Sequence, residues 1–346
     1  MTTETLRCAV IGVGRMGRHH ARVYAQTEGV DLVGVVDADP EAAMAITREW
    51  GGTAFGSVSE LISHGVDAVT IATPTVHHRE AADALVAERV ACLIEKPLAP
   101  NVQEAQAIAD AAAKHGTVLQ VGHIVRYDPV MIAVKKVVDE YGITPRFIEM
   151  DRISPMTFRS VDVGVVLDMM IHDLDLLLML LGEEPEEIHA NAVSVMGEAE
   201  DVCNARLVFP AAADGTRCVA NVTASRLALK TERKLRVISE DAYISADFVE
   251  RRGSAVRKTA NAEQLAEVRL RLAGGEDLSS VDYTELVAVD ELHIDNTEPL
   301  RCQIDTFLGA VRAGTKPAVD ARAGFAAVRT AERIVEAARA AGARMV

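Results

Sequence analysis

The sequence has few cysteines and no close pair of them. The five are scattered over 346 residues, at Cys8, Cys92, Cys203, Cys218 and Cys302. This spacing argues against a disulfide framework and a zinc ribbon, and it is typical of proteins from a reducing compartment. The N-terminus also lacks a basic start, a long apolar run and a cleavage site, so we expect a cytoplasmic protein.

A surplus of basic residues is lacking as well. The chain has 36 Lys and Arg residues against 51 Asp and Glu residues, which gives a formal net charge of −15. Nucleic acids and anionic membrane surfaces are bound through basic surfaces. We therefore expect neither of them as a main partner.

The sequence contains no uninterrupted hydrophobic run that is long enough to span a membrane. Its most apolar segment, residues 161–181, is interrupted by Asp162, Asp168, His172, Asp173 and Asp175. A lipid-facing helix does not tolerate so many polar groups. We therefore expect a core helix in this segment.

The composition is that of a globular protein, with 49% hydrophobic and 25% charged residues. At about 150 residues per domain, the length predicts two domains. The sequence pattern changes near residues 123–128, which places one domain at 1–125 and the other at 126–346.

Short β-branched runs alternate with alanine-rich helical stretches in the first domain. The pattern predicts strands at 7–12, 32–37, 68–72, 91–95 and 118–122, and helices near 17–26, 40–50, 77–88 and 102–115. This order predicts an α/β Rossmann domain, in which helices cover a doubly wound parallel sheet.

The second domain has consecutive strand-like runs joined by short turns. We expect strands at 188–195, 204–209, 218–225, 234–239 and 242–247, with helices at 131–141, 164–181, 301–313 and 322–341. Residues 261–282 are charged and predict an exposed, mobile connection. The result is an α+β domain with a mostly antiparallel open sheet. Its large open face predicts a homodimer or homotetramer through this sheet.

A glycine pattern, Gly12-x-Gly14-x-x-Gly17, follows the first predicted strand directly and begins a helix. Such a loop makes a tight turn, allows a pyrophosphate to approach the backbone and lets helix and strand pack closely. Asp37 ends the second strand, where its carboxylate accepts hydrogen bonds from ribose hydroxyls. The pattern therefore predicts a dinucleotide site that includes Arg15 and Met16.

Charges near Asp37 favour NAD over NADP. Asp37 and Asp39 repel a 2′-phosphate, and Ala38 stands where an arginine would hold one. Arg15 lies near the expected pyrophosphate or adenine, and for this reason NADP stays open as the second cofactor.

Several short motifs together resemble one enzyme family. They are Glu95-Lys96-Pro97 after a strand, Thr73-Pro74 with His77, Gly122-His123 with Arg126, and Asp168-x-x-x-His172. With the glycine-rich loop, they resemble the glucose–fructose oxidoreductase, inositol dehydrogenase and rhizopine-catabolism family. The resemblance implies that nicotinamide and substrate bind in a cleft between the domains. It also implies that Thr73, Pro74, His77, Glu95 and Lys96 contribute to the cofactor site, with a Lys-Pro peptide that is often cis.

Oxidation of a secondary alcohol by NAD requires a base for the hydroxyl proton. Asp168 and His172 are four residues apart on a helix, so we expect the carboxylate to orient the imidazole as proton acceptor. Lys96 binds the reacting oxygen or is itself the base. The alternatives are a structural Asp168–His172 pair and an ion pair of Lys96 with Glu95. No third ligand is evident, so no metal is expected.

Arginines near the expected cleft point to an anionic substrate. Arg126, Arg152 and Arg159 precede the Asp168 helix, and we assign Arg126, Arg159 and His123 to the substrate. A second basic run, Arg226, Lys230, Arg233, Lys234 and Arg236, is assigned to a solvated or subunit-facing strand surface.

The stretches 154–172 and 223–226 are similar to the branch of the family that oxidises UDP-N-acetylglucosamine at its 3-hydroxyl. We therefore expect a sugar or nucleotide-sugar dehydrogenase. Two alternatives remain, a neutral polyol or aldose dehydrogenase and a non-catalytic NAD-binding regulator.

Overall fold

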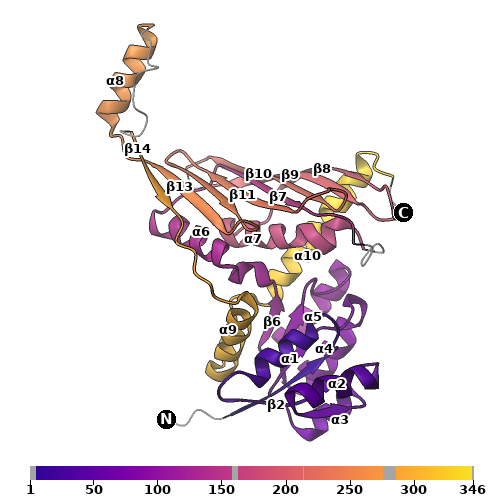
Figure 1. The fold of residues 1–346 in the computed structure, drawn as a ribbon. Coiled ribbons are helices and arrows are strands. Elements are labelled where there is room, and N and C mark those ends of the chain that lie inside the picture. Colours follow the sequence, from indigo (N-terminus) through magenta and orange to yellow (C-terminus); the bar gives the residue numbers. More distant parts are fainter. Residues whose placement is uncertain (1–4, 158–162, 213, 276–285, 345–346) are drawn as a thin grey trace.

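Two sheets with their helices are stacked in the structure, a computed structural model that describes residues 5–157, 163–212, 214–275 and 286–344. Sheet A and its helices form the lower part of Figure 1, and sheet B forms the upper part. No helix among these described residues is long and apolar enough to cross a membrane.

Sheet A is parallel throughout, as predicted. Its strand order is β3 (Thr53–Phe55), β2 (Val30–Val36), β1 (Leu6–Ile11), β4 (Ala68–Ile71), β5 (Ala91–Glu95) and β6 (Leu119–Gly122). The helices are α1 (Gly17–Ala25), α2 (Pro40–Trp50), α3 (Val58–His64), η1 (Thr75–His77), α4 (His78–Ala87) and α5 (Val102–His115). The prediction missed β3 and α3, because a strand of three residues and a helix of seven are too short to show a clear hydrophobic period.

Sheet B is antiparallel except where β7 and β10 pair in parallel. Its order is β14 (Val287–Glu291), β13 (Arg252–Lys258), β12 (Ala242–Asp247), β11 (Glu232–Ile238), β7 (Phe147–Ile153), β10 (Arg217–Ser225), β9 (Val202–Ala211) and β8 (Glu187–Val193). The mostly antiparallel sheet is confirmed. The prediction missed β7, β13 and β14, in which charged residues interrupt the apolar runs.

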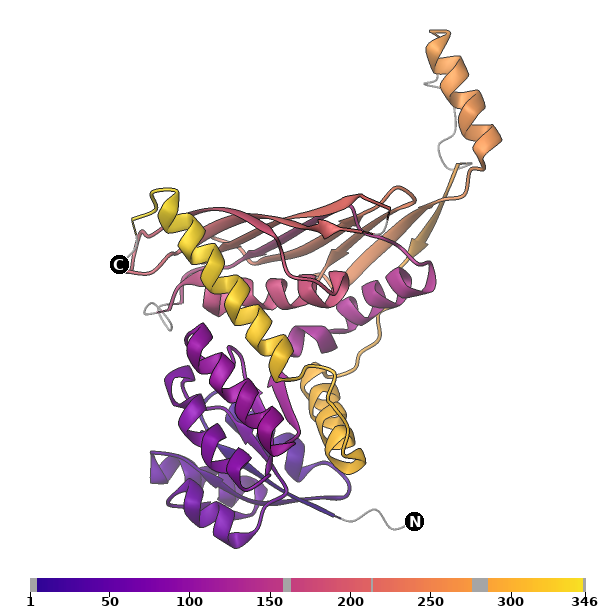
Figure 2. The same cartoon turned by 180° about the vertical axis from the view of Figure 1, so that it is seen from behind.

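Helices cover one face of sheet B, and the other face is open (Figures 1 and 2). The covering elements are η2 (Ile124–Tyr127), α6 (Pro129–Glu140), η3 (Val166–Met170), α7 (Ile171–Leu181) and α10 (Ala321–Ala340). Successive strand residues point to opposite faces. Thus Ala220 and Val222 of β10 are fully buried against the helices, whereas the intervening Asn221 is only half-buried.

The closing segment of the chain returns to sheet A. Helix α9 (Pro299–Ala313) packs Ile304 and Phe307 into the same core as Cys8 and Val10 of β1. Further along, the backbone N–H of Val121 donates to the carbonyl of Val319. Residues near both ends of the chain therefore contribute to the core that packs against sheet A.

The segment after β13 is mostly exposed in its described part, as expected, but it contains a helix that the sequence analysis did not predict. Within 261–282 the structure has a helix, α8 (Ala262–Ala273), which extends away from the edge of sheet B (Figure 2). Asn261 and Gln264 form a reciprocal cap at its start, which is the local reason for the helix. Residues 276–285 of the same segment lie outside the described residues.

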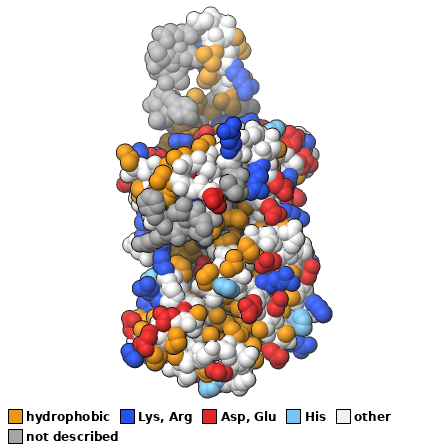
Figure 3. Space-filling model, turned by 90° about the vertical axis from the view of Figure 1, so that its right-hand side faces the viewer, with side chains coloured by type: hydrophobic (Ala, Val, Ile, Leu, Met, Phe, Trp, Pro, Cys, Tyr) orange, Lys and Arg blue, Asp and Glu red, His pale blue; other side chains and the backbone are white. Residues whose placement is uncertain are grey.

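The surface seen from the side mixes charges of both signs. Acidic, basic and hydrophobic side chains are interspersed over this face of the molecule (Figure 3). Basic side chains of the described residues on this face form no continuous surface of the kind that nucleic acids bind (Figure 3).

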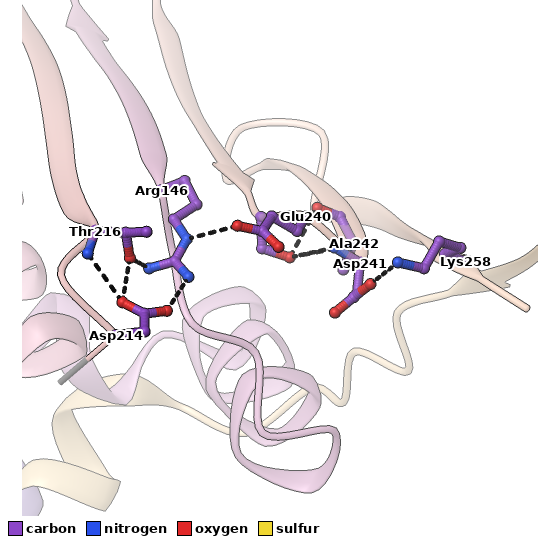
Figure 4. Close-up of polar contacts among 8 residues, drawn as sticks. Arg146, Asp214, Thr216, Glu240, Asp241, Ala242 and Lys258 are labelled. Carbon is purple, nitrogen blue, oxygen red and sulfur yellow. Dashed lines mark hydrogen bonds and ion pairs between the residues drawn. The ribbon is translucent and has the colours of Figure 1, made fainter. Parts of the chain in front are cut away.

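A polar cluster ties two turns together at the start of β7. Arg146 donates to the Thr216 hydroxyl and to Asp214 Oδ2 at 2.5 Å, and its Nε lies 3.5 Å from Glu240 Oε1 (Figure 4). Hydrogen bonds from Thr216 and from Arg146 hold the pKa of the Asp214 carboxyl well below its ordinary value. This cluster lies at the start of β7, whereas Arg152, which lines the cavity described below, lies near the end of that strand.

Candidate active site

The glycine-rich loop is packed closely on two sides and open on the third. A Cβ on Gly12 would lie 2.7 Å from the Thr73 nitrogen, and one on Gly17 would lie 1.8 Å from the Gly12 oxygen. Nothing lies within 4 Å of a Cβ placed on Gly14. The loop therefore fits a dinucleotide, because Gly12 and Gly17 permit the tight turn while Gly14 leaves backbone accessible to a pyrophosphate.

Asp37 lies beside this loop, as predicted. Its Oδ2 accepts the Val13 N–H at 2.6 Å, and its Oδ1 accepts the Asp39 N–H at 2.9 Å. Asp39, not Asp37, caps helix α2, since its side chain accepts the Glu41 N–H at 3.0 Å. The remaining lone pairs of Asp37 are available to ribose hydroxyls.

His78 connects the loops after β4 and β5, a role that the sequence analysis missed. Its Nδ1 lies 3.0 Å from the Pro97 carbonyl oxygen, and its Nε2 lies 3.0 Å from that of Thr73. Burial lowers the pKa of His78, although these carbonyls oppose the shift. His77, the residue assigned to the cofactor site, is exposed. The Lys96-Pro97 peptide is cis, as the resemblance implied.

Lys96 contacts Asp168 rather than Glu95. Its Nζ donates to the Asp168 carbonyl at 2.8 Å and to the Asp168 carboxylate at 3.2 Å. Glu95 pairs with His20, whose Nε2 lies 2.8 Å from Oε1. Burial alone would raise the pKa of Glu95, but the His20 hydrogen bond and the charge of Lys96 outweigh it, so the pKa is lowered.

The expected hydrogen bond between Asp168 and His172 is not present. Asp168 lies in η3, a π-helical turn with i to i+5 hydrogen bonds, so the α-helical register between residues four apart does not apply. The Asp168 carboxylate contacts Lys96, and Nδ1 of His172 is buried without a hydrogen-bond partner. Burial, followed by the charges of Lys96 and Arg152, lowers the pKa of His172 well below its ordinary value. The imidazole is therefore neutral near pH 7.

These groups face a cavity of about 650 Å³ between the glycine-rich loop and sheet B. Residues from both domains line it, among them Arg15, Met16, Glu95, Lys96, Asp168 and His172. Its lining includes Arg15 of the glycine-rich loop on one side and Arg152 and Arg233 of sheet B on the other. No group of three His, Cys, Asp or Glu side chains suited to a metal occurs among the described residues.

Two residues assigned to the substrate lie elsewhere. Arg126 binds Asp175 in a two-pronged pair, with Nε to Oδ2 at 2.7 Å and Nη2 to Oδ1 at 2.5 Å, and it lines a different cavity. His123 is 1% exposed, has no hydrogen-bond partner at either ring nitrogen, and lies 3.9 Å from Asp175. The sequence analysis assigned both residues to the substrate because the sequence does not show that Asp175 lies beside them in the fold. Arg159 lies outside the described residues.

Three other arginines line the cavity. Arg152 pairs with the buried Asp173 at 2.6 Å, and Arg226 pairs with Asp201 at 2.6 Å. Arg226 is 6% exposed, so its assignment to a solvated surface was wrong. Arg233 is exposed, but it lies on the wall of the cavity. The sequence could have indicated this position, because residues two apart in a strand share a face and Arg233 is two residues from the buried Leu235.

A parallel sheet with a glycine-rich loop, facing an antiparallel sheet across a cavity with Lys96, defines a two-domain oxidoreductase with an NAD-binding Rossmann fold. The model of the oxidoreductase family with that fold matches residues 6–123, and the model of the GFO/IDH/MocA C-terminal domain matches residues 149–245. The chain belongs to the Gfo/Idh/MocA oxidoreductase family, which confirms the resemblance and sets aside the non-catalytic alternative.

Relatives in this family differ in substrate. The UDP-N-acetylglucosamine 3-dehydrogenase of Acidithiobacillus ferrooxidans is 38% identical over 244 residues, which cover 70% of this chain and 74% of the relative. Its solved structure matches with a TM-score of 0.83 at 32% identity, over 97% of this chain and 98% of that one. The inositol 2-dehydrogenase of Rhizobium meliloti is 27% identical over 342 residues, 96% of each chain.

Proposed function

We propose that the protein uses NAD to oxidise a secondary hydroxyl of a nucleotide sugar, with UDP-N-acetylglucosamine to its 3-keto form as first candidate. The observation that carries this proposal is the position of Lys96. Its ammonium faces the cavity, is fixed by Asp168 and lies in the same lining as His172 and the loop residues Arg15 and Met16.

The side chains support a division of labour at the reacting hydroxyl. When bound, nicotinamide accepts the hydride of the carbinol carbon. An ammonium has three donors. Two of those on Lys96 contact Asp168, so the third is available to the substrate oxygen and stabilises its developing negative charge. The neutral imidazole of His172 has a lone pair that accepts the hydroxyl proton.

The position of Asp37 supports NAD rather than NADP as the cofactor in this proposal. Its carboxylate is fixed by two backbone N–H groups beside the loop, where it would repel a 2′-phosphate. Residues 1–125 hold the cofactor in this proposal, and residues 126–346 hold the substrate.

The nucleotide-sugar assignment draws support from the relative that is 38% identical and named for UDP-N-acetylglucosamine. A neutral polyol is the second candidate, because the inositol dehydrogenase relative is similar over 96% of this chain. NADH formation distinguishes the two candidates. We expect turnover with UDP-N-acetylglucosamine and at most slow turnover with myo-inositol or glucose. Turnover with the neutral polyols alone would overturn the nucleotide-sugar proposal.

We also propose that two or four copies associate through the open face of sheet B. This face is free of helices in the structure and carries half-buried residues such as Val219 and Asn221. Light scattering after gel filtration tests the proposal, and a monomer at micromolar concentration would contradict it.

A further inference from the structure

Arg233 presents a positive charge to the cavity from sheet B. It lines the cavity together with Lys96 and His172. Its side chain lies on the same side of β11 as the buried Leu235, which is the side covered by helices. Among the described residues, its guanidinium has neither a hydrogen bond nor a carboxylate in ion-pair contact.

The other cations on this wall are neutralised by carboxylates. The pairs are Arg152 with Asp173 at 2.6 Å, Arg226 with Asp201 at 2.6 Å, and Lys96 with Asp168 at 3.2 Å. Arg15 is also exposed, but it belongs to the glycine-rich loop on the opposite wall and faces the cofactor site. Within the described part of the chain, Arg233 is therefore the unneutralised cation on the substrate side.

The surroundings of Arg233 disfavour a lone cation. Its residue stands directly opposite Arg152 in the pairing of β11 with β7. Like charges opposite each other destabilise a sheet. Burial and the charge of Arg152 accordingly lower the pKa of Arg233, while Asp173 and Asp128 oppose the shift from a distance. An anion bound beside Arg233 would offset this unfavourable environment.

We propose that Arg233 binds a phosphoryl or carboxylate group of the substrate at the sheet wall of the cavity, and that in a nucleotide sugar this group is the diphosphate. The planar guanidinium matches either group with two parallel hydrogen bonds. The anionic end is thereby held against β11, and the sugar hydroxyl is directed toward Lys96. This inference rests on the proposed function, because it names the feature of the substrate that the cavity recognises.

The test compares Arg233→Gln with Lys234→Gln in the NAD-bound full-length protein. Lys234 is the adjacent cation, and its side chain points to the opposite face of β11, so both variants lose the same charge. Loss of a charge-assisted hydrogen bond predicts a KM for UDP-N-acetylglucosamine that is roughly tenfold to a hundredfold higher in Arg233→Gln, with kcat within about twofold. Arg233→Lys should recover part of the affinity, and Lys234→Gln should leave KM unchanged.

Direct binding separates this inference from the proposed function. Calorimetry with UDP, inorganic pyrophosphate, glucuronate and myo-inositol requires no turnover. We expect UDP to bind the wild type more tightly than Arg233→Gln, and myo-inositol to show no such difference. Preference for glucuronate over UDP would assign the site to a carboxylate and reject the diphosphate.

Two results would overturn the proposal. One is equal binding of all four probes by the wild type and Arg233→Gln, including no binding by either. The other is a loss confined to kcat or to NAD affinity. Failure of every nucleotide sugar to yield NADH, with UDP binding still dependent on Arg233, would reject the proposed function alone.

Discussion

The Nε2 atom of His20 lies 2.8 Å from Oε1 of Glu95, and both side chains are buried. His20 belongs to α1, the helix that begins at the glycine-rich loop, and Glu95 precedes Lys96. The network continues from His20 Nδ1 to Thr70 at 3.2 Å, and from the Thr70 hydroxyl to Tyr24 at 2.8 Å. This buried network therefore fixes the expected cofactor helix relative to the strand that carries Lys96.

Replacing His20 should destabilise the protein. His20→Leu removes the hydrogen-bond partner of the buried Glu95 side chain, and a buried polar group left without its partner costs about 1–3 kcal/mol, or more when it is charged. Urea unfolding at pH 7 measures the change. The adjacent His19 is exposed, so His19→Leu is the matched control and should cost less than about 0.5 kcal/mol. Equal effects of the two substitutions would contradict the role of the pair.

The same pair predicts sensitivity to acid. The pKa of Glu95 is lowered in the folded state from its ordinary value of 4.5. The stability that it contributes is therefore present above pH 4.5 and is lost as the pH falls through the lowered value. The difference in unfolding free energy between wild type and Glu95→Gln should shrink below pH 4.5, and a constant difference would argue against this linkage.

Lys96→Met should abolish most of the activity without weakening NAD binding. The variant removes the donor to the substrate oxygen, and loss of such a group lowers kcat by roughly 10²- to 10⁴-fold. Steady-state NADH formation and NAD titration by fluorescence provide the two measurements. Lys114→Met, on the exposed side of α5, is the control and should match the wild type. A kcat that survives in Lys96→Met would contradict the role of Lys96 at the substrate oxygen.

Stability should fall as the pH is lowered from about 7.5 to about 5.5. Burial lowers the pKa values of His123 and His172 below 6.5 in the folded protein, so the unfolded chain binds more protons over this range. Their contribution is fully present above pH 6.5. His123→Phe keeps an aromatic ring and removes one titrating group. It should flatten the pH dependence of the unfolding free energy, and an unchanged slope would contradict this account.

Cofactor preference should depend on Asp37 more than on Asp39. Asp37→Asn keeps an acceptor for the Val13 N–H but removes the charge that repels a 2′-phosphate. The ratio of kcat/KM for NADP to that for NAD should rise on the order of tenfold. Asp39→Asn preserves the cap of α2 and should change the ratio much less. A wild type that already prefers NADP would reject the proposal.

Local sequence patterns predicted the parallel sheet, the glycine-rich loop and the position of Asp37, because each depends on residues that are close in the chain. The charge pairs were not predictable in this way. Arg126 and Asp175 are 49 residues apart, and only the packing of η2 against α7 brings them together. The π-helical turn at Asp168 was equally hidden, since a continuous apolar stretch gives no sign of one extra residue in a turn.

Arg233 is a different case, because its side could have been predicted. The alternation that buries Leu235 and Val237 places Arg233 on the same face and Lys234 on the other. The sequence analysis treated the basic run as one surface because it counted charges without applying the period of a strand. The position of Arg233 at the cavity, by contrast, depends on the pairing of β11 with β7, which cannot be predicted from a single sequence.

The return of α9 to sheet A has a consequence for synthesis of the chain. The strands that hold the glycine-rich loop leave the ribosome early, but Ile304 and Phe307 complete their core only after more than three hundred residues have been translated. Helices α1 and α2 contribute to this core early, but the part that α9 covers stays exposed until then, a state prone to aggregation. The domain that is translated first is therefore completed last, and residues 1–125 expressed alone would leave that part of the core exposed.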